Sequence, residues 1–129
     1  KATSNICANS GLCALAFNIH LTLLGETGVK KLAALNHARA CQLADRLANV
    51  NGVEVINETF FNEFSIRLSQ SAGDVIERLA QRNILGGVAA RRLYQDRPEL
   101  DNVLLIAVTE TVSDADMEAL VQALTEELS

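Results

Sequence analysis

The sequence predicts a layered α/β protein of the two-layer α+β kind, with two helices followed by β-β-α-β-β-α and a small, mostly antiparallel sheet. Three observations predict this class. Helical apolar periodicity occupies the first 49 residues, apolar and polar residues alternate over 63–68, and an unbroken apolar run covers 103–108. A chain of 129 residues is long enough for one domain with a single core.

The first helical segment, over residues 11–24, is apolar on nearly every face. A helix that is apolar all round must be covered on all sides, and a chain of this length covers one with difficulty. We therefore expect an exposed apolar patch and self-association of the isolated chain. The run from Leu12 to Leu24 is interrupted by Asn18 and His20 and is too short to cross a bilayer. Nothing at the start resembles a cleavable signal, so we expect no membrane contact and a cytoplasmic location.

A break at 25–28 separates this segment from a second helix that ends near Asn49. Its polar residues lie largely opposite one apolar stripe, so it is predicted to cover one face of the core. The stripe consists of Val29, Leu32, Ala33, Ala40, Leu43, Ala44 and Leu47.

The remaining elements follow from periodicity and turn signals. Strands are predicted from Val53, over 63–68 and over 84–88, where a glycine pair indicates a close backbone approach. The run 103–108 is predicted to be a central strand covered on both faces. Helices are predicted after cap-rich sequences at 71–74 and 113–116, and a polar loop with the sole proline joins the last two strands.

Composition excludes several function classes. A net charge of −5 with 11 dispersed Lys and Arg residues argues against a nucleic-acid partner, which needs clustered cations. Aromatic residues make up 4% and Trp is absent, so the core is aliphatic. Cys7, Cys13 and Cys41 suggest neither a disulfide framework nor a metal site, and we expect them to be small buried hydrophobes.

Several motifs together resemble one enzyme family. They are Lys1–Cys7 with the following Asn9 and 12–15, then 60–64, 84–87, 98–100 and 108–111, in this order. The chain resembles the P-protein of the glycine cleavage system, in particular subunit 1 of the two-subunit form. It departs from the family at Ala8 and at 88–91.

The resemblance implies a pyridoxal-phosphate enzyme of the aspartate-aminotransferase fold. Residues 1–129 would be its small C-terminal domain and a fragment of a longer chain, with 1–49 a helical lead packing on the missing large domain and 50–129 the sheet layer. The parent would be a glycine dehydrogenase that decarboxylates glycine and transfers the aminomethyl group to the lipoyl arm of the H-protein. Subunit 2 would carry the cofactor lysine, and the parent would be a hetero-oligomer.

The sequence itself supplies no evident cofactor lysine. A Schiff-base lysine needs a partly buried pocket, whereas Lys1 is the terminal residue and Lys30 and Lys31 lie in the first turn of an amphipathic helix. The pair Gly86-Gly87 lacks the spacing of a phosphate loop. The resemblance implies pyridoxal phosphate in the parent. Because no evident cofactor lysine is present, we expect none bound to this fragment and no activity of the fragment alone.

No catalytic or metal-binding residue is predicted. The resemblance implies that Thr3, Ser4 and Asn5 approach the active site or the partner subunit, although helix capping alone would also explain them. Arg91 and Arg92 form the local basic cluster, with Arg97 nearby. The cluster is either a site for a carboxylate or phosphate from a neighbouring domain or a solvated loop.

Two hypotheses remain open at this point. One is a structural and interface domain of the glycine-decarboxylating enzyme, inactive alone. The other is a free-standing α/β module for protein interaction or small-ligand regulation, which the self-contained β-β-α-β-β-α order suggests.

Overall fold

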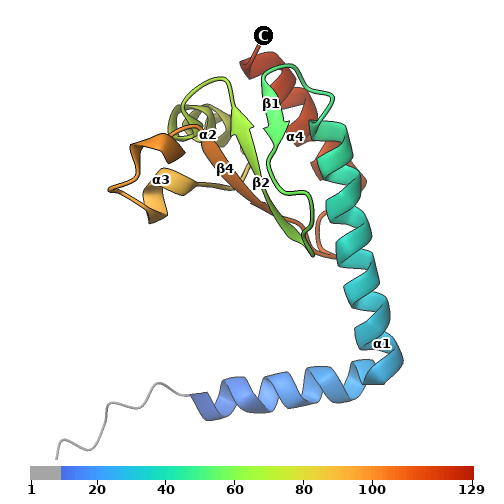
Figure 1. Cartoon of the computed structure of the whole chain (residues 1–129). Coiled ribbons are helices and arrows are strands. Elements are labelled where there is room, and N and C mark those ends of the chain that lie inside the picture. Colours follow the sequence, from blue (N-terminus) through green and yellow to red (C-terminus); the bar gives the residue numbers. More distant parts are fainter. Residues whose placement is uncertain (1–9) are drawn as a thin grey trace, which may run out of the picture. The chain divides into compact units, whose positions relative to one another are not determined.

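A computed structural model describes residues 10–129 of the chain (Figure 1). It divides into one unit that extends to Ala33 and a second unit from Ala34 to Ser129. Thr3, Ser4 and Asn5 lie outside the described residues. The two units are considered in turn.

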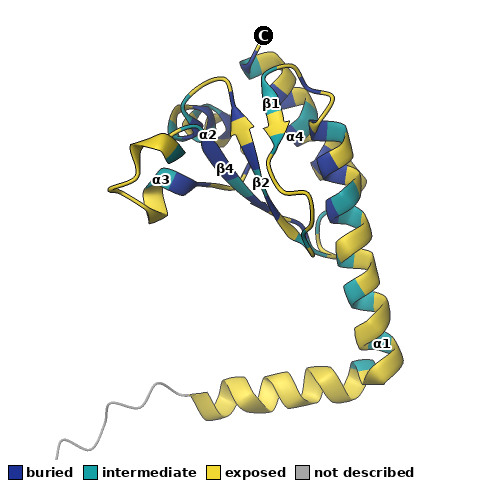
Figure 2. Cartoon of the chain, in the orientation of Figure 1, coloured by how far each residue is buried: buried dark blue, intermediate teal, exposed yellow. Residues whose placement is uncertain are grey.

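The first unit consists of the initial part of helix α1 (Ser10–Leu47). Gly25 has non-helical φ and ψ of 60° and −178° inside this helix, so the predicted break is confirmed as a single-residue kink. Large apolar side chains before the kink are exposed, with Leu12 at 64%, Phe17 at 61% and Leu23 at 82% (Figure 2). The apolar patch expected from the sequence is present in this unit.

Helix α1 also contains an 18-residue window with a mean hydropathy of 1.3, none of which is buried. Length and composition alone would allow such a helix to cross a membrane, but the test is weak because core helices of soluble proteins also pass it. The kink at Gly25 ends the most apolar stretch well short of the roughly 20 residues that a spanning helix needs.

The second unit is built on a four-stranded sheet in the order β1-β2-β4-β3. Its strands are β1 (Val53–Val55), β2 (Glu63–Leu68), β3 (Val88–Ala89) and β4 (Val103–Ala107). Every neighbouring pair is antiparallel. The antiparallel sheet and the central position of the 103–108 run were both predicted correctly.

All the core helices lie on one face of this sheet (Figure 1). They are the last part of α1, α2 (Ala72–Gln81) and α4 (Asp114–Glu127). Ile66 lies opposite Leu104 in the register, so these side chains share the covered face. The unit therefore has two layers around one aliphatic core, whose largest fully buried members are Leu47, Ile66, Leu68, Leu79, Leu104, Met117, Leu124, Val75 and Val108.

Two sequence predictions need correction. The strand expected over 84–88 is wrong except at Val88, where β3 begins, because left-handed backbone at Gly87 (φ 132°) interrupts the run directly before it. A short helix, α3 (Ala90–Leu93), and a 3₁₀ turn, η1 (Pro98–Leu100), follow it. Strand β4 is covered on both faces only at its start, since Val103 is buried on the side opposite α1, α2 and α4, whereas Leu105 is half-buried and Ala107 exposed on that side.

Helix α4 begins with the capping arrangement that the sequence predicts. The Ser113 Oγ accepts the Asp116 N–H at 3.2 Å, and the Ser113 N–H donates to Asp116 Oδ2 at 2.8 Å. The Ser113 hydroxyl also donates to Asp116 Oδ2 at 2.6 Å, and this bond, followed by the one from the Ser113 backbone N–H, lowers the pKa of Asp116 below its ordinary value. The carboxylate form is therefore the one that the cap stabilises.

Replacing Ser113 by Ala is expected to lower the free energy of unfolding by about 1 kcal/mol, because it removes the acceptor for an unpaired helix N–H. Urea titration would measure this, and Ser113→Thr should retain most of the stability.

Because the folded pKa of Asp116 is lowered, its stabilising effect is present above its ordinary pKa and disappears as the pH falls through the folded value. Equal pH dependence of native and Ser113→Ala protein below pH 4 would contradict this account.

Candidate functional site

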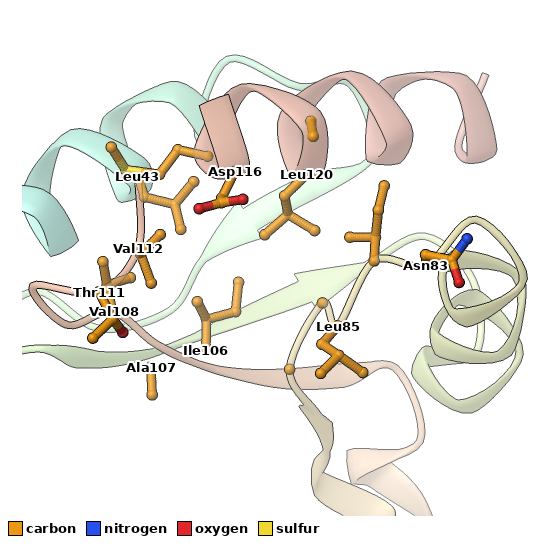
Figure 3. Close-up of a pocket in the computed structure, with 15 residues that line it drawn as sticks. Leu43, Asn83, Leu85, Ile106, Ala107, Val108, Thr111, Val112, Asp116 and Leu120 are labelled. Atoms are coloured by element: carbon orange, nitrogen blue, oxygen red, sulfur yellow. The ribbon is translucent and has the colours of Figure 1, made fainter. Parts of the chain in front are cut away.

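One pocket lies in the second unit, between the 83–87 segment, the end of β4 and helix α4 (Figure 3). Its volume is about 420 Å³. The wall is mainly aliphatic and includes Leu85, Ile106 and Leu120 (Figure 3). Leu85 is 96% exposed, so its side chain adds apolar surface at the rim.

The glycine pair brings the 83–87 segment close to the core. A Cβ on Gly86 would lie 2.6 Å from Leu79 Cδ1, and one on Gly87 would clash with the carbonyl oxygen of Leu105. The close backbone approach predicted from this pair is confirmed. The glycines therefore have a packing role that requires no bound phosphate.

Two of the polar side chains at this pocket, those of Asp116 and Thr111, already have local partners. The Asp116 carboxylate is held in the Ser113 cap. The hydroxyl oxygens of Thr111 and Thr109 lie 2.8 Å apart and share a hydrogen bond. The pocket is thus better suited to packing an apolar side chain than to acid–base chemistry.

The second pocket brings together the two arginines predicted as site residues. Arg91 and Arg92 both line a space of about 340 Å³ next to β3. The pocket is completed by Gly73, Ile76, Glu77, Gly87, Val88, Ala89 and Asp101. Arg97, the third member of the sequence cluster, forms an ion pair with Glu99 instead. The hydrogen bond from Arg97 is the main cause of the lowered pKa of Glu99, with a smaller contribution from the charge of Arg91.

The pairing of arginines separates these two from most others in the chain. Carboxylates pair with Arg46, Arg67, Arg78, Arg82 and Arg97. Within residues 10–129, neither Arg91 nor Arg92 has a carboxylate oxygen within 4 Å. The Nη1 atom of Arg91 is buried and has no hydrogen-bond partner. Within the described residues, Arg91 therefore has no ion pair within 4 Å and no hydrogen bond at Nη1, a feature that Arg39 Nη1 shares.

The uncovered face of the sheet forms a third pocket, of about 380 Å³, that the sequence reasoning missed. Val88, Leu93 and Leu105 line it together with Glu63 and Ser65. The alternation in β2 signalled one solvated face. The unbroken apolar run of β4 gave no sign that β4 also has a partly solvated face.

A contact around His37 was also missed. Its ring stacks on Phe61 with centroids 6.1 Å apart, and Nδ1 lies 2.8 Å from the Phe61 carbonyl oxygen. Cys41 Sγ is 3.7 and 3.8 Å from the two ring nitrogens, which places it beside the ring edge rather than in line with either. No group of three or more possible metal ligands occurs among residues 10–129. The expectation of buried cysteines is wrong for Cys13, which is exposed on α1, and for Cys41, which is partly exposed.

Comparison with known proteins decides the family. Residues 1–124 match the family model for the glycine cleavage system P-protein. The chain belongs to the glycine cleavage system P-protein family. The resemblance predicted from the short motifs is thereby confirmed over the whole chain.

Relatives in the P-protein family place the match within subunit 1. The probable glycine dehydrogenase (decarboxylating) subunit 1 of Erythrobacter litoralis is 57% identical over 129 residues, which is 100% of this chain and 28% of that protein. The protein of the same name from Rhodospirillum centenum is 61% identical over 128 residues, 99% of this chain and 28% of its own length. The chain thus spans little more than a quarter of the curated relatives that it matches.

A solved P-protein structure supports the same assignment at the level of the fold. The crystal structure of glycine decarboxylase (P-protein) of the glycine cleavage system, in inhibitor-bound form, matches with a TM-score of 0.80 and 34% identity. The match covers 98% of this chain and 28% of that chain. The mixed α/β arrangement therefore corresponds to a portion of a P-protein.

Proposed function

We propose that this chain acts as part of a glycine-decarboxylating P-protein, in which it contributes structure and subunit contacts. Its similarity to subunit 1 proteins over its whole length, at 57% to 61% identity, carries this proposal. The parent enzyme would decarboxylate glycine and pass the aminomethyl group to the lipoyl arm of the H-protein, with subunit 2 as the partner.

The family implies pyridoxal phosphate, which supplies an electron sink for decarboxylation when it is bound. The described residues do not fit a site for it. Lys30 is bonded to Glu26 at 2.5 Å, Lys30 and Lys31 are both exposed, and neither lines a described pocket. We therefore derive no step of the reaction from this part of the chain. The family resemblance implies that subunit 2 carries the cofactor lysine.

Within the parent, the proposed role is that of the small C-terminal domain of an aspartate-aminotransferase-like fold. Residues 1–49 would form the helical lead that packs on the large domain, and 50–129 the sheet layer. The exposure of Leu12, Phe17 and Leu23 supports this arrangement, because burying large apolar side chains against a partner is favourable in free energy. The interruption at Gly25 favours contact of this helix with protein rather than with lipid. The enzyme would accordingly be cytoplasmic.

The interface would also include the residues singled out in the sequence. Thr3, Ser4 and Asn5 would lie at the active-site edge or the partner contact, with Arg91 and Arg92 on the sheet unit. The buried Nη1 of Arg91, which has no hydrogen-bond partner among the described residues, supports the second part of this assignment.

Leu23→Asp in the intact subunit 1 is expected to reduce both association with subunit 2 and glycine decarboxylation at least tenfold. Leu23 is 82% exposed here, so the substitution leaves this chain's own core intact but would bury an unpaired charge in the assembly. Co-purification and carbon dioxide release from labelled glycine would measure the two effects. Asn18→Asp adds the same charge on the same helix at a position already polar, and both quantities should stay within twofold.

A Leu23→Asp enzyme that assembles and turns over normally would refute the buried-helix role. Hydrogen exchange of the isolated chain tests the alternative of a free-standing module. Slow exchange of the amides of 12–24 in a monodisperse sample would favour that module, whereas rapid exchange would favour the enzyme domain.

A further inference from the structure

We propose that the pocket around Arg91 and Arg92 binds a monoanionic carboxylate, and that in the assembled enzyme an Asp or Glu side chain from outside this chain supplies it. The carboxylate specificity rests on this chain's own residues. The protein source of the carboxylate rests on the proposed function above.

The Arg91 guanidinium is partly buried and lacks an acceptor at one of its nitrogens. Its Nη1 is buried without an acceptor, and the residue as a whole is half-buried. A partly desolvated guanidinium without a directly bonded acceptor is unfavourable, since lost hydration is not replaced by a charge-assisted hydrogen bond. An anion entering from the pocket would bind the remaining donors and restore that balance.

Aliphatic side chains lie beside the two arginines in this pocket. Ile76, Val88 and Ala89 form aliphatic walls beside the two arginines. Apolar walls lower the local dielectric and strengthen the attraction between a guanidinium and a bound anion. The nearest ion-paired carboxylate, Glu99, is engaged by Arg97 and does not occupy the pocket lining.

The charge balance of the lining distinguishes a carboxylate from a phosphate. Glu77 and Asp101 line the same pocket as Arg91 and Arg92, so the formal charges of the lining cancel. A dianionic phosphate would face two carboxylates, whereas a single carboxylate can align with the planar fork of one guanidinium. The pocket therefore favours the smaller charge.

The test is a titration of the 129-residue chain with sodium acetate and, separately, inorganic phosphate, at an ionic strength held constant with sodium chloride. The readout is the Nε–H resonance of each arginine side chain by NMR. We expect saturable shifts at Arg91 with acetate and at least threefold weaker binding of phosphate. Arg91→Gln should weaken acetate binding at least tenfold, and Arg91→Lys should weaken it less because the charge remains. Arg82→Gln removes a guanidinium already paired with Glu126 and should leave acetate binding unchanged.

A second arm identifies the source. In the intact subunit 1 bound to subunit 2, a protein carboxylate in the pocket would abolish the acetate shifts at Arg91. Undiminished acetate binding there would overturn the protein source. Tighter binding of phosphate than acetate would overturn the carboxylate assignment, and the absence of saturable shifts in the isolated chain would overturn the site. None of these results depends on glycine turnover, so they are separable from a failure of the proposed enzyme role.

Discussion

Gly87→Ala is expected to lower the free energy of unfolding of the second unit by about 3 to 5 kcal/mol. Gly87 has φ of 132°, a conformation in which an L side chain is strained. The added Cβ would also collide with the Leu105 carbonyl oxygen, which belongs to the rigid backbone of β4. Relief of the collision would require β3 to move away from β4 and break the Val88–Leu105 pairing. Urea-induced unfolding followed by circular dichroism would measure the change.

Gly73→Ala is the matched control for this substitution. Gly73 lies in α2, its φ is not positive, and an added Cβ would come no closer than 3.7 Å to a neighbouring atom. Its stability should be unchanged or higher by up to about 1 kcal/mol, because Ala favours helix. If both substitutions destabilise equally, the effect at Gly87 does not come from its conformation or the close approach to β4.

Leu104→Ala is expected to cost about 3 to 5 kcal/mol of unfolding free energy, through lost burial and the cavity it leaves. Leu104 is fully buried and lies between Ile66 and Ala89 at the centre of the covered sheet face. Rigid neighbours on both strands limit collapse into the space. The same urea titration would measure the loss, and the slope with denaturant should stay constant if the native fold is kept.

Leu93→Ala provides the corresponding surface control. Leu93 is 59% exposed at the rim of the uncovered sheet face. Its removal from the isolated chain should change stability by less than about 0.5 kcal/mol. A loss comparable to that of Leu104→Ala would mean that the uncovered face contributes to the core.

Sequence reasoning located the elements whose signals are local. The alternation of β2 gave its bounds of 63–68, and the Ser113–Asp116 pair marked the start of α4. Both signals arise within a few residues, so they can be read without knowing what packs on them.

The errors arose where structure depends on distant residues. The run over 84–88 has strand composition, yet the left-handed backbone at Asn83 and Gly87 limits pairing to β3. The run over 103–108 is apolar throughout, but composition cannot indicate that the core helices α1, α2 and α4 all pack on one side of it. The half-buried Leu105 and the exposed Ala107 would be expected at a contact with another part of the parent.

The candidate site was predictable to a similar extent. Arg91 and Arg92 were evident as neighbours in sequence. Their pocket was not, because its other walls come from α2, β3 and Asp101, which only the fold brings together. The contact between His37 and Phe61 likewise joins residues that are 24 positions apart.

The two edge strands of the sheet affect how copies of the free chain would associate with one another. Edge strand β3 has 2 residues and β1 has 3, and the outer face of β1 carries a Glu54–Arg67 ion pair with its neighbour. Edges this short and charged offer few free backbone groups for adding a strand from another molecule. Contacts between copies should therefore form through helix α1, as side-chain packing that detergent can reverse, and the sheet should not seed amyloid-like fibres.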